Sequence, residues 1–105
     1  MLYELRIYHT YPGRLQAICG RFANLTLGIF PNHGIKVTEF WVDATGKDTI
    51  CYLCEFADEK AQKAAWDSFE RDPAWVAGKA ASEADGPIVE RIESYSMTRA
   101  EFFKK

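Results

Sequence analysis

Three side chains that can bind or transfer protons alternate along the first predicted strand of this chain. Glu4, Arg6 and Tyr8 occupy every second position, and alternate residues of a β-strand point to the same side of the sheet. A guanidinium can hold a carboxylate or enolate oxygen through two hydrogen bonds, and a phenol can donate one more. The row therefore predicts either a binding site for a small oxyanion or an ion pair that organises an interface.

The chain contains two histidines, His9 and His33, and either could act as a general base near neutral pH. His33 precedes Gly34, where an imidazole commonly caps the end of a helix. His9 lies near the end of the first strand and has the opposite parity to Arg6. A structural role is the simpler interpretation for both, and both stay candidates for catalysis beside Glu4.

Cys51 and Cys54 have the spacing of a metal or redox motif. In a strand, however, a spacing of three places the two sulfurs on opposite faces, whereas metal and redox pairs need a turn or a helix start. The sequence also lacks a second ligand pair, a phosphate-binding glycine loop and a dinucleotide fingerprint. We therefore expect neither a metal nor a cofactor.

Composition narrows the class of protein. The 105 residues are 48% hydrophobic and 14% aromatic, which is too apolar for disorder and suits one domain over residues 1–105. The net charge is −2 and the basic residues are scattered, so we expect no nucleic-acid partner. No apolar run reaches the roughly 20 residues of a membrane helix, and we expect no membrane partner. An odd number of cysteines, three, fits a cytoplasmic protein.

Periodicity and turn residues predict four strands and two helical regions. The strands are expected over residues 3–9, 35–42, 49–56 and 88–97. The first helix starts near Leu15 and is interrupted at Gly28 and Pro31, while the second runs from Asp58 to Arg71 and continues after Pro73. The order β-α-β-β-α-β predicts an α+β, ferredoxin-like fold, with a four-stranded antiparallel sheet and the helices on one face.

Such a fold leaves one face of the sheet uncovered. We expect Leu5 and Ile7 to lie under the helices, so that Glu4, Arg6 and Tyr8 line the uncovered face. The aromatic side chains expected to join them are Tyr52, Phe56 and either Phe40 or Trp41, since the faces of strand 35–42 stay open. That face is too apolar for water. Two copies packed sheet to sheet would form a homodimeric barrel with these residues around a cavity, and the free helix surface leaves higher oligomers open.

Five short segments together resemble the NIPSNAP family. They are Tyr3-Glu4-Leu5-Arg6-x-Tyr8, Pro12-Gly13, His33-Gly34-Ile35-Lys36, Phe40-Trp41 and Asp72-Pro73-x-Trp75, in an order that spans residues 2 to about 97. The resemblance implies a dimeric α+β barrel. That superfamily includes cofactor-free monooxygenases, haem-degrading enzymes and small-molecule isomerases, so the resemblance implies a fold more closely than a reaction.

Two classes of function follow. In the first, a homodimer binds a small, partly apolar ligand that is acidic or enolisable, at Glu4, Arg6, Tyr8 and the aromatic residues. As an enzyme it would resemble a cofactor-independent monooxygenase or an isomerase, with Arg6 polarising an oxygen. In the second, the same residues only hold a non-catalytic binding or assembly module together.

Overall fold

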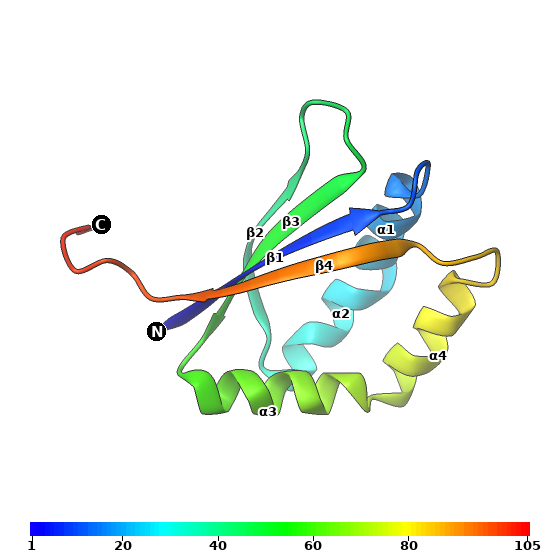
Figure 1. The fold of residues 1–105 in the computed structure, drawn as a ribbon. Helices are drawn as coiled ribbons and strands as arrows, with labels where there is room; N and C mark the ends of the chain where they lie inside the picture. The colour runs from blue at the N-terminus through cyan, green and yellow to red at the C-terminus, as the bar shows by residue number, and fades with distance from the viewer.

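A computed structural model describes residues 1–105 and consists of one sheet and one layer of helices (Figure 1). The strands are β1 (Leu2–Thr10), β2 (Lys36–Val42), β3 (Thr49–Phe56) and β4 (Val89–Met97). The helices are α1 (Leu15–Arg21), α2 (Leu27–Ile29), α3 (Glu59–Glu70) and α4 (Pro73–Ser82), with a π-helical turn over Phe22–Thr26 and a 3-10 turn over Phe30–His33. No helix has both the length and the apolar composition to cross a membrane.

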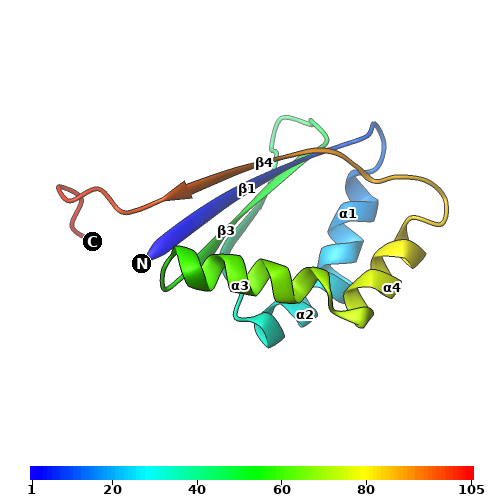
Figure 2. The ribbon, with the colours of Figure 1, turned by 60° about the horizontal axis from the view of Figure 1, so that its bottom comes forward.

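The strands form one antiparallel sheet in the order β2-β3-β1-β4. All helices lie on the same side of it, and the other side is bare (Figure 2). The smallest extent of the molecule is 19 Å, as expected for one sheet and one helical layer. The predicted α+β, ferredoxin-like fold is confirmed.

Local side-chain chemistry sets the helix ends where the sequence predicts them. The Asp58 carboxylate accepts a hydrogen bond from the Ala61 amide and starts α3, and the Asp72 carboxylate does the same for Ala74 at the start of α4. Gly34 ends the 3-10 turn with φ +75°, a conformation that glycine adopts without strain.

The segment from Leu15 to His33 differs from the expected helix followed by a separate turn. It is one helical run whose π turn replaces a break at Gly28. The wider turn of a π-helix is common at functional sites. Here it brings Arg21, Phe22 and Thr26 to the buried side of the run, where each is less than 10% exposed.

Strand β2 contains an irregularity that alternation alone does not predict. Val37 pairs with Cys54, but Glu39 pairs with Leu53, so the register shifts at Thr38. A bulge of this kind changes the side to which the following residues point. Phe40 therefore faces the helices opposite Tyr52, and Trp41 faces the bare side opposite Cys51.

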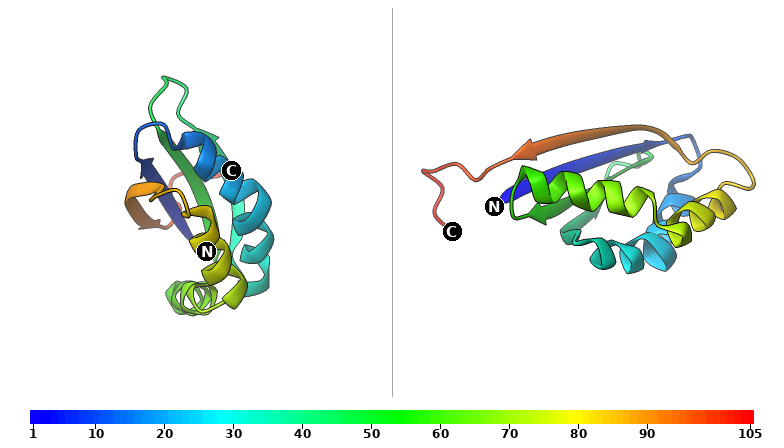
Figure 3. Two further views of the ribbon diagram at one scale, coloured as in Figure 1. Left: turned by 90° about the vertical axis from the view of Figure 1, so that its right-hand side faces the viewer. Right: turned by 90° about the horizontal axis from the view of Figure 1, so that it is seen from below.

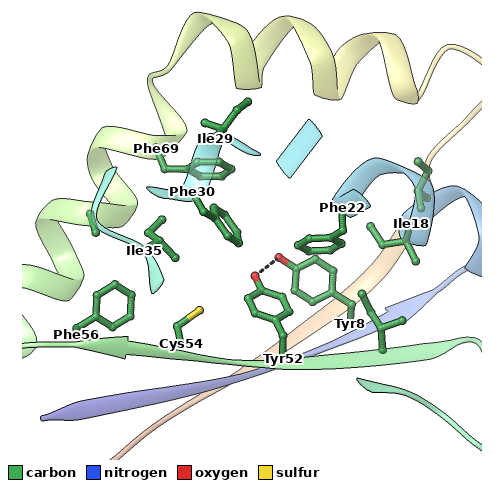
Figure 4. Packing of buried hydrophobic residues seen from close by; sticks show 13 residues of the cluster. Tyr8, Ile18, Phe22, Ile29, Phe30, Ile35, Tyr52, Cys54, Phe56 and Phe69 are labelled. Atoms are coloured by element: carbon green, nitrogen blue, oxygen red, sulfur yellow. Dashed lines mark hydrogen bonds between the residues drawn. The ribbon is translucent and has the colours of Figure 1, made fainter. Parts of the chain in front are cut away.

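The hydrophobic core lies between the sheet and the helices (Figure 4). The sheet contributes Tyr8, Ile50, Tyr52, Cys54 and Phe56 to it. These residues share a face with Glu4 and Arg6, which pair with Cys54 and Tyr52 across the sheet. The expectation that Leu5 and Ile7 lie under the helices is therefore wrong, and it is the Glu4-Arg6-Tyr8 row that the helices cover.

The bare side of the sheet carries apolar side chains at its centre and charged ones, Glu39, Glu55, Arg91 and Glu93, among them. Its residues include Tyr3, Leu5, Ile7, Trp41, Leu53, Tyr95 and Met97. Trp41, Tyr95 and Met97 are between 43% and 48% exposed. The segment after β4 extends away from both layers (Figures 1 and 3), and its Phe102 is 90% exposed.

Candidate functional site

A cavity of about 710 Å³ lies between the helices and the sheet. Its size is that of a small-molecule site. Arg6 and Tyr8 of β1 line it, and the aromatic side chains around it come from the long helical run, α3 and α4. The aromatic lining residues are Phe22, Phe30, Trp66, Phe69 and Trp75.

Glu4 lies beside Arg6 next to this cavity, and its carboxylate accepts four hydrogen bonds. Its Oε1 accepts from the Trp66 indole at 2.7 Å and the Gln62 amide at 2.8 Å. Its Oε2 accepts from the Ser94 hydroxyl at 2.6 Å and from Arg6 Nη1 at 3.0 Å. Burial raises the pKa of this carboxyl, but the four hydrogen bonds outweigh it and the pKa is lower than usual. Glu4 is thus a fixed anion without a free lone pair for a proton transfer.

Arg6 is held in place from several directions and still has donors to spare. Nε donates to the Tyr52 hydroxyl at 2.9 Å, Nη1 donates to Glu4, and Nη2 donates to the Tyr8 hydroxyl at 3.2 Å. The guanidinium carbon also lies 4.3 Å from the centre of the Trp66 ring, a cation–π contact. Because a guanidinium carries five N–H groups, one on each Nη remains without a protein acceptor.

The two tyrosine hydroxyls beside Arg6 form a short chain. Tyr8 and Tyr52 are hydrogen bonded at 3.0 Å (Figure 4). Burial raises the pKa of Tyr52 well above its usual value, so this hydroxyl keeps its proton. Either hydroxyl can donate in this pair. Because Tyr52 is fully buried and has no other acceptor within reach, we assign it as the donor to Tyr8. The proton of Tyr8, which lines the cavity, then stays free for a ligand.

Arg21 is a cavity residue that the sequence analysis missed. It is the last residue of α1, directly before the π turn. Its side chain is 5% exposed, and its Nη1 donates to the Ser82 hydroxyl at 3.3 Å. The sequence feature that could have identified Arg21 is its position on the apolar face of the helix, at helical spacing from Ile18, Phe22 and Leu25.

The other aromatic residues of the predicted site take different positions. The Phe40 ring stacks on Tyr52 at 5.3 Å, and Phe56 packs 6.2 Å from Trp66. Both rings lie on the helix side of the sheet and pack against residues next to the cavity, but they do not line the cavity themselves. Trp41 lies on the bare side of the sheet and does not belong to the cavity.

Neither histidine reaches the cavity. His9 Nε2 lies 2.6 Å from Glu93 Oε1 on the bare side of the sheet. Two of the residues predicted as candidates for catalysis, His9 and His33, therefore lie outside the cavity.

His33 instead joins Ser68 and Asp72. Its Nδ1 lies 2.5 Å from Ser68 Oγ and its Nε2 lies 2.7 Å from Asp72 Oδ2. A Ser-His-Asp hydrolase has the two partners on the opposite nitrogens. The other Asp72 oxygen starts α4, and hydrogen bonds from His33 and Ala74 lower the Asp72 pKa. The contacts of His33 with Ser68 and Asp72 connect the 3-10 turn to the junction of α3 and α4. His33 therefore has a structural role, but its ring bonds these two side chains rather than the helix carbonyls that the sequence suggested.

The cysteines occupy separate environments. Cys51 is on the bare side and Cys54 is on the helix side, as the alternation predicts. Burial, together with the nearby Glu4 charge, raises the pKa of the Cys54 thiol to about 12, so that thiol is neutral and a poor nucleophile. No three His, Cys, Asp or Glu side chains converge on a common point.

Comparison with known proteins identifies related chains over the whole length. An uncharacterised NIPSNAP domain protein from Burkholderia xenovorans is 22% identical, superposes with a TM-score of 0.84, and the match covers 100% of both chains. A NIPSNAP family protein of unknown function from Agrobacterium tumefaciens is 20% identical with a TM-score of 0.83, and the match covers 98% of this chain and 91% of that one.

A more distant likeness has the same fold. An antibiotic biosynthesis monooxygenase is 13% identical with a TM-score of 0.65, and the match covers 95% of this chain and 99% of that one. No curated protein matches the sequence. The sequence model of the NIPSNAP family matches residues 3–104, and the chain therefore belongs to the NIPSNAP family.

Proposed function

We propose that this NIPSNAP protein binds a small, partly apolar oxyanion in the cavity between the sheet and the helices. The observation that carries the proposal is the set of hydrogen-bond donors of Arg6 and Tyr8 that have no protein acceptor on the sheet side of the cavity. Arg6 has two N–H groups without acceptors, and Tyr8 keeps one unused proton. Charged donors fixed by other residues bind an oxyanion without a large ordering cost.

The walls indicate the rest of the ligand. Phe22, Phe30 and Trp75 are among the aromatic side chains around the cavity, and such surfaces favour a flat apolar body. An aromatic carboxylate or an enolised carbonyl compound has both parts. Glu4 acts here by neutralising and orienting Arg6, not by taking a proton, because its four acceptor positions are occupied.

The proposed assembly is a homodimer that covers the bare side of the sheet. Leu5, Ile7 and Leu53 lie at the centre of that side, with the exposed Trp41 and Tyr95 nearby. A second copy is the occupant that fits, because a two-fold axis brings the same apolar surface to both partners. In this arrangement the ligand cavity and the dimer interface are on opposite sides of the sheet.

A cofactor-independent oxygenase is a second candidate function, supported by the fold shared with an antibiotic biosynthesis monooxygenase. Donors such as Arg6 and Tyr8 would stabilise an electron-rich phenolate or enolate. Oxygen uptake with a panel of phenols and quinols tests this function. Uptake that Tyr8→Phe slows would favour an oxygenase, whereas binding of the same compounds without uptake would leave a non-catalytic binding protein.

Equilibrium dialysis with 2-naphthoate tests the binding site. We expect the acid to bind at least tenfold more tightly than the neutral 2-naphthylmethanol, because charged hydrogen bonds are worth about 1.5–3 kcal/mol. Arg6→Met should remove that preference and leave the sedimentation coefficient of the dimer unchanged. Loss of the dimer with unchanged binding would favour a purely structural Arg6.

A second variant keeps the test decisive if Arg6→Met unfolds. Tyr8→Phe removes only the hydroxyl and leaves the ring that packs 5.4 Å from Phe22. We expect it to fold and to weaken 2-naphthoate about threefold to tenfold, in line with one neutral hydrogen bond. Equal binding of the acid and the alcohol to the unmodified protein would refute the oxyanion site.

A further inference from the structure

Arg21 is the one buried side chain whose polar atoms are not all hydrogen bonded. Its Nε has no partner and is shielded from solvent, while the guanidinium lines the same cavity as Arg6. An unpaired buried donor on a charged group is costly. Native proteins retain few such groups, and each one calls for an explanation.

The contacts of Arg21 are confined to one end of the guanidinium. Nη1 donates to Ser82 at 3.3 Å and lies 3.7 Å from the Glu83 carboxylate. Nη2 has no protein acceptor and, unlike Nε, is not shielded from solvent. Its N–H groups are charged donors that an oxyanion in the cavity can reach.

The neighbouring groups do not account for the buried charge. The Glu83 oxygen is beyond hydrogen-bond distance of Nη1, and Glu83 is part-exposed. Burial lowers the Arg21 pKa, and the attraction of Glu83 does not fully offset it. An oxyanion at Nη2 would supply the missing counter-charge.

We propose that Arg21 is a second anion-binding residue of the cavity and that the ligand carries two acidic groups joined by a flat apolar body. This inference rests on the proposed function, since Arg6 and Tyr8 hold one group and Arg21 holds the other.

Aromatic rings link the two arginines. Arg6 lies against Trp66 at 4.3 Å and Arg21 lies 5.4 Å from the Trp75 ring. Phe69 lies between these tryptophans, with ring centres 6.0 Å and 4.7 Å away. The cavity lining therefore contains two arginines joined by a chain of aromatic rings, together with the carboxylates of Glu70, Glu83 and Glu90.

Binding of mono- and dicarboxylates tests the proposal. The probes are 2-naphthoate and the isomers of naphthalenedicarboxylate, measured by equilibrium dialysis. We expect at least one diacid to bind tenfold or more tightly than the monoacid. Arg21→Met should abolish this advantage without changing the binding of 2-naphthoate. Lys63→Met, which removes an exposed charge from a surface pair, should preserve the advantage.

The outcomes separate the two claims. If the monoacid depends on Arg6 but no diacid gains, or the gain survives Arg21→Met, the second site is refuted and the first stands. If no acid binds, the proposed function fails and the second anion site fails with it. A lower urea midpoint for ligand-free Arg21→Met would then identify Arg21 as a structural partner of Glu83 and Ser82.

Discussion

The two sides of β1 differ in a way that reverses the usual relation between polarity and burial. Towards the helices, Glu4 is 3% exposed and Tyr8 is 7% exposed, with Arg6 between them. Towards the bare side, Leu5 and Ile7 are only partly buried within one chain. The polar row is covered, and the apolar row is open.

Hydrogen-bond partners on the helices and on β4, rather than polarity alone, decide which row of β1 is covered. Glu4 can be buried because Trp66 and Gln62 of α3 and Ser94 of β4 donate to it. A buried ionic group without such donors would be unstable. The apolar row has no comparable cover from its own chain, and the proposed homodimer supplies it.

Glu4→Gln should have the largest effect on the covered side. The amide leaves Arg6 without its counter-ion and puts an NH₂ group against donors, so the free energy of unfolding should fall by about 3 kcal/mol. Urea denaturation measures this. Asp67→Asn is the matched control, because Asp67 makes only an exposed pair with Lys63 on α3, and should change stability by less than about 0.5 kcal/mol.

The same carboxyl predicts a pH dependence. Its pKa in the folded protein is below the ordinary value of 4.5, so the folded state favours the ionised form. The stability that Glu4 contributes is present above pH 4.5 and is lost as the pH falls through its lower folded pKa. Unfolding measured between neutral pH and pH 3 should show a shallower acid loss in Glu4→Gln. An identical pH profile in both proteins would contradict the account.

On the bare side, Ile7→Asp should break the proposed dimer. A carboxylate buried between two sheets without a partner costs several kcal/mol, so the dimer Kd should rise by about 100-fold or more. Sedimentation measures the change. Leu27→Asp, a charge at a partly exposed site on α2, is the control and should leave the dimer intact. A monomeric unmodified protein at micromolar concentration would refute the dimer.

Tyr52→Phe should have the smallest effect of the three. It removes the acceptor of Arg6 Nε and the donor to Tyr8 while keeping the buried ring, and should lower the free energy of unfolding by about 1–2 kcal/mol. Tyr95→Phe is its counterpart on the bare side and removes an exposed bond to Glu93. Equal urea midpoints for the two variants would show that the Tyr52 hydroxyl contributes nothing special.

Alternation and turn residues were sufficient to predict the fold and, within β1 and β3, the residues that share a face. Glu4, Arg6 and Tyr8 do lie together, and Asp58, Gly34 and Pro73 mark their elements as expected. Alternation does not show which of the two faces the helices cover, however, because that depends on contacts with residues distant in the sequence.

Two further features depend on the same kind of distant information. The bulge at Thr38, which separates Phe40 from Trp41, has no marker such as glycine. The burial of Arg21 depends on a π turn and on the packing of α4, where a Cβ on Gly78 would lie 2.5 Å from Leu25. Local periodicity predicts neither.

The indole N–H signals of the three tryptophans test the central claim directly, because Trp66 and Trp75 line the cavity and Trp41 lies on the bare side. A ¹H–¹⁵N spectrum is recorded during titration with 2-naphthoate, with each signal assigned by a Trp→Phe variant. We expect the Trp66 and Trp75 signals to shift with one common Kd while the Trp41 signal stays in place. A shift of Trp41 with the two cavity signals unmoved would put the ligand on the opposite side of the sheet and contradict the central claim.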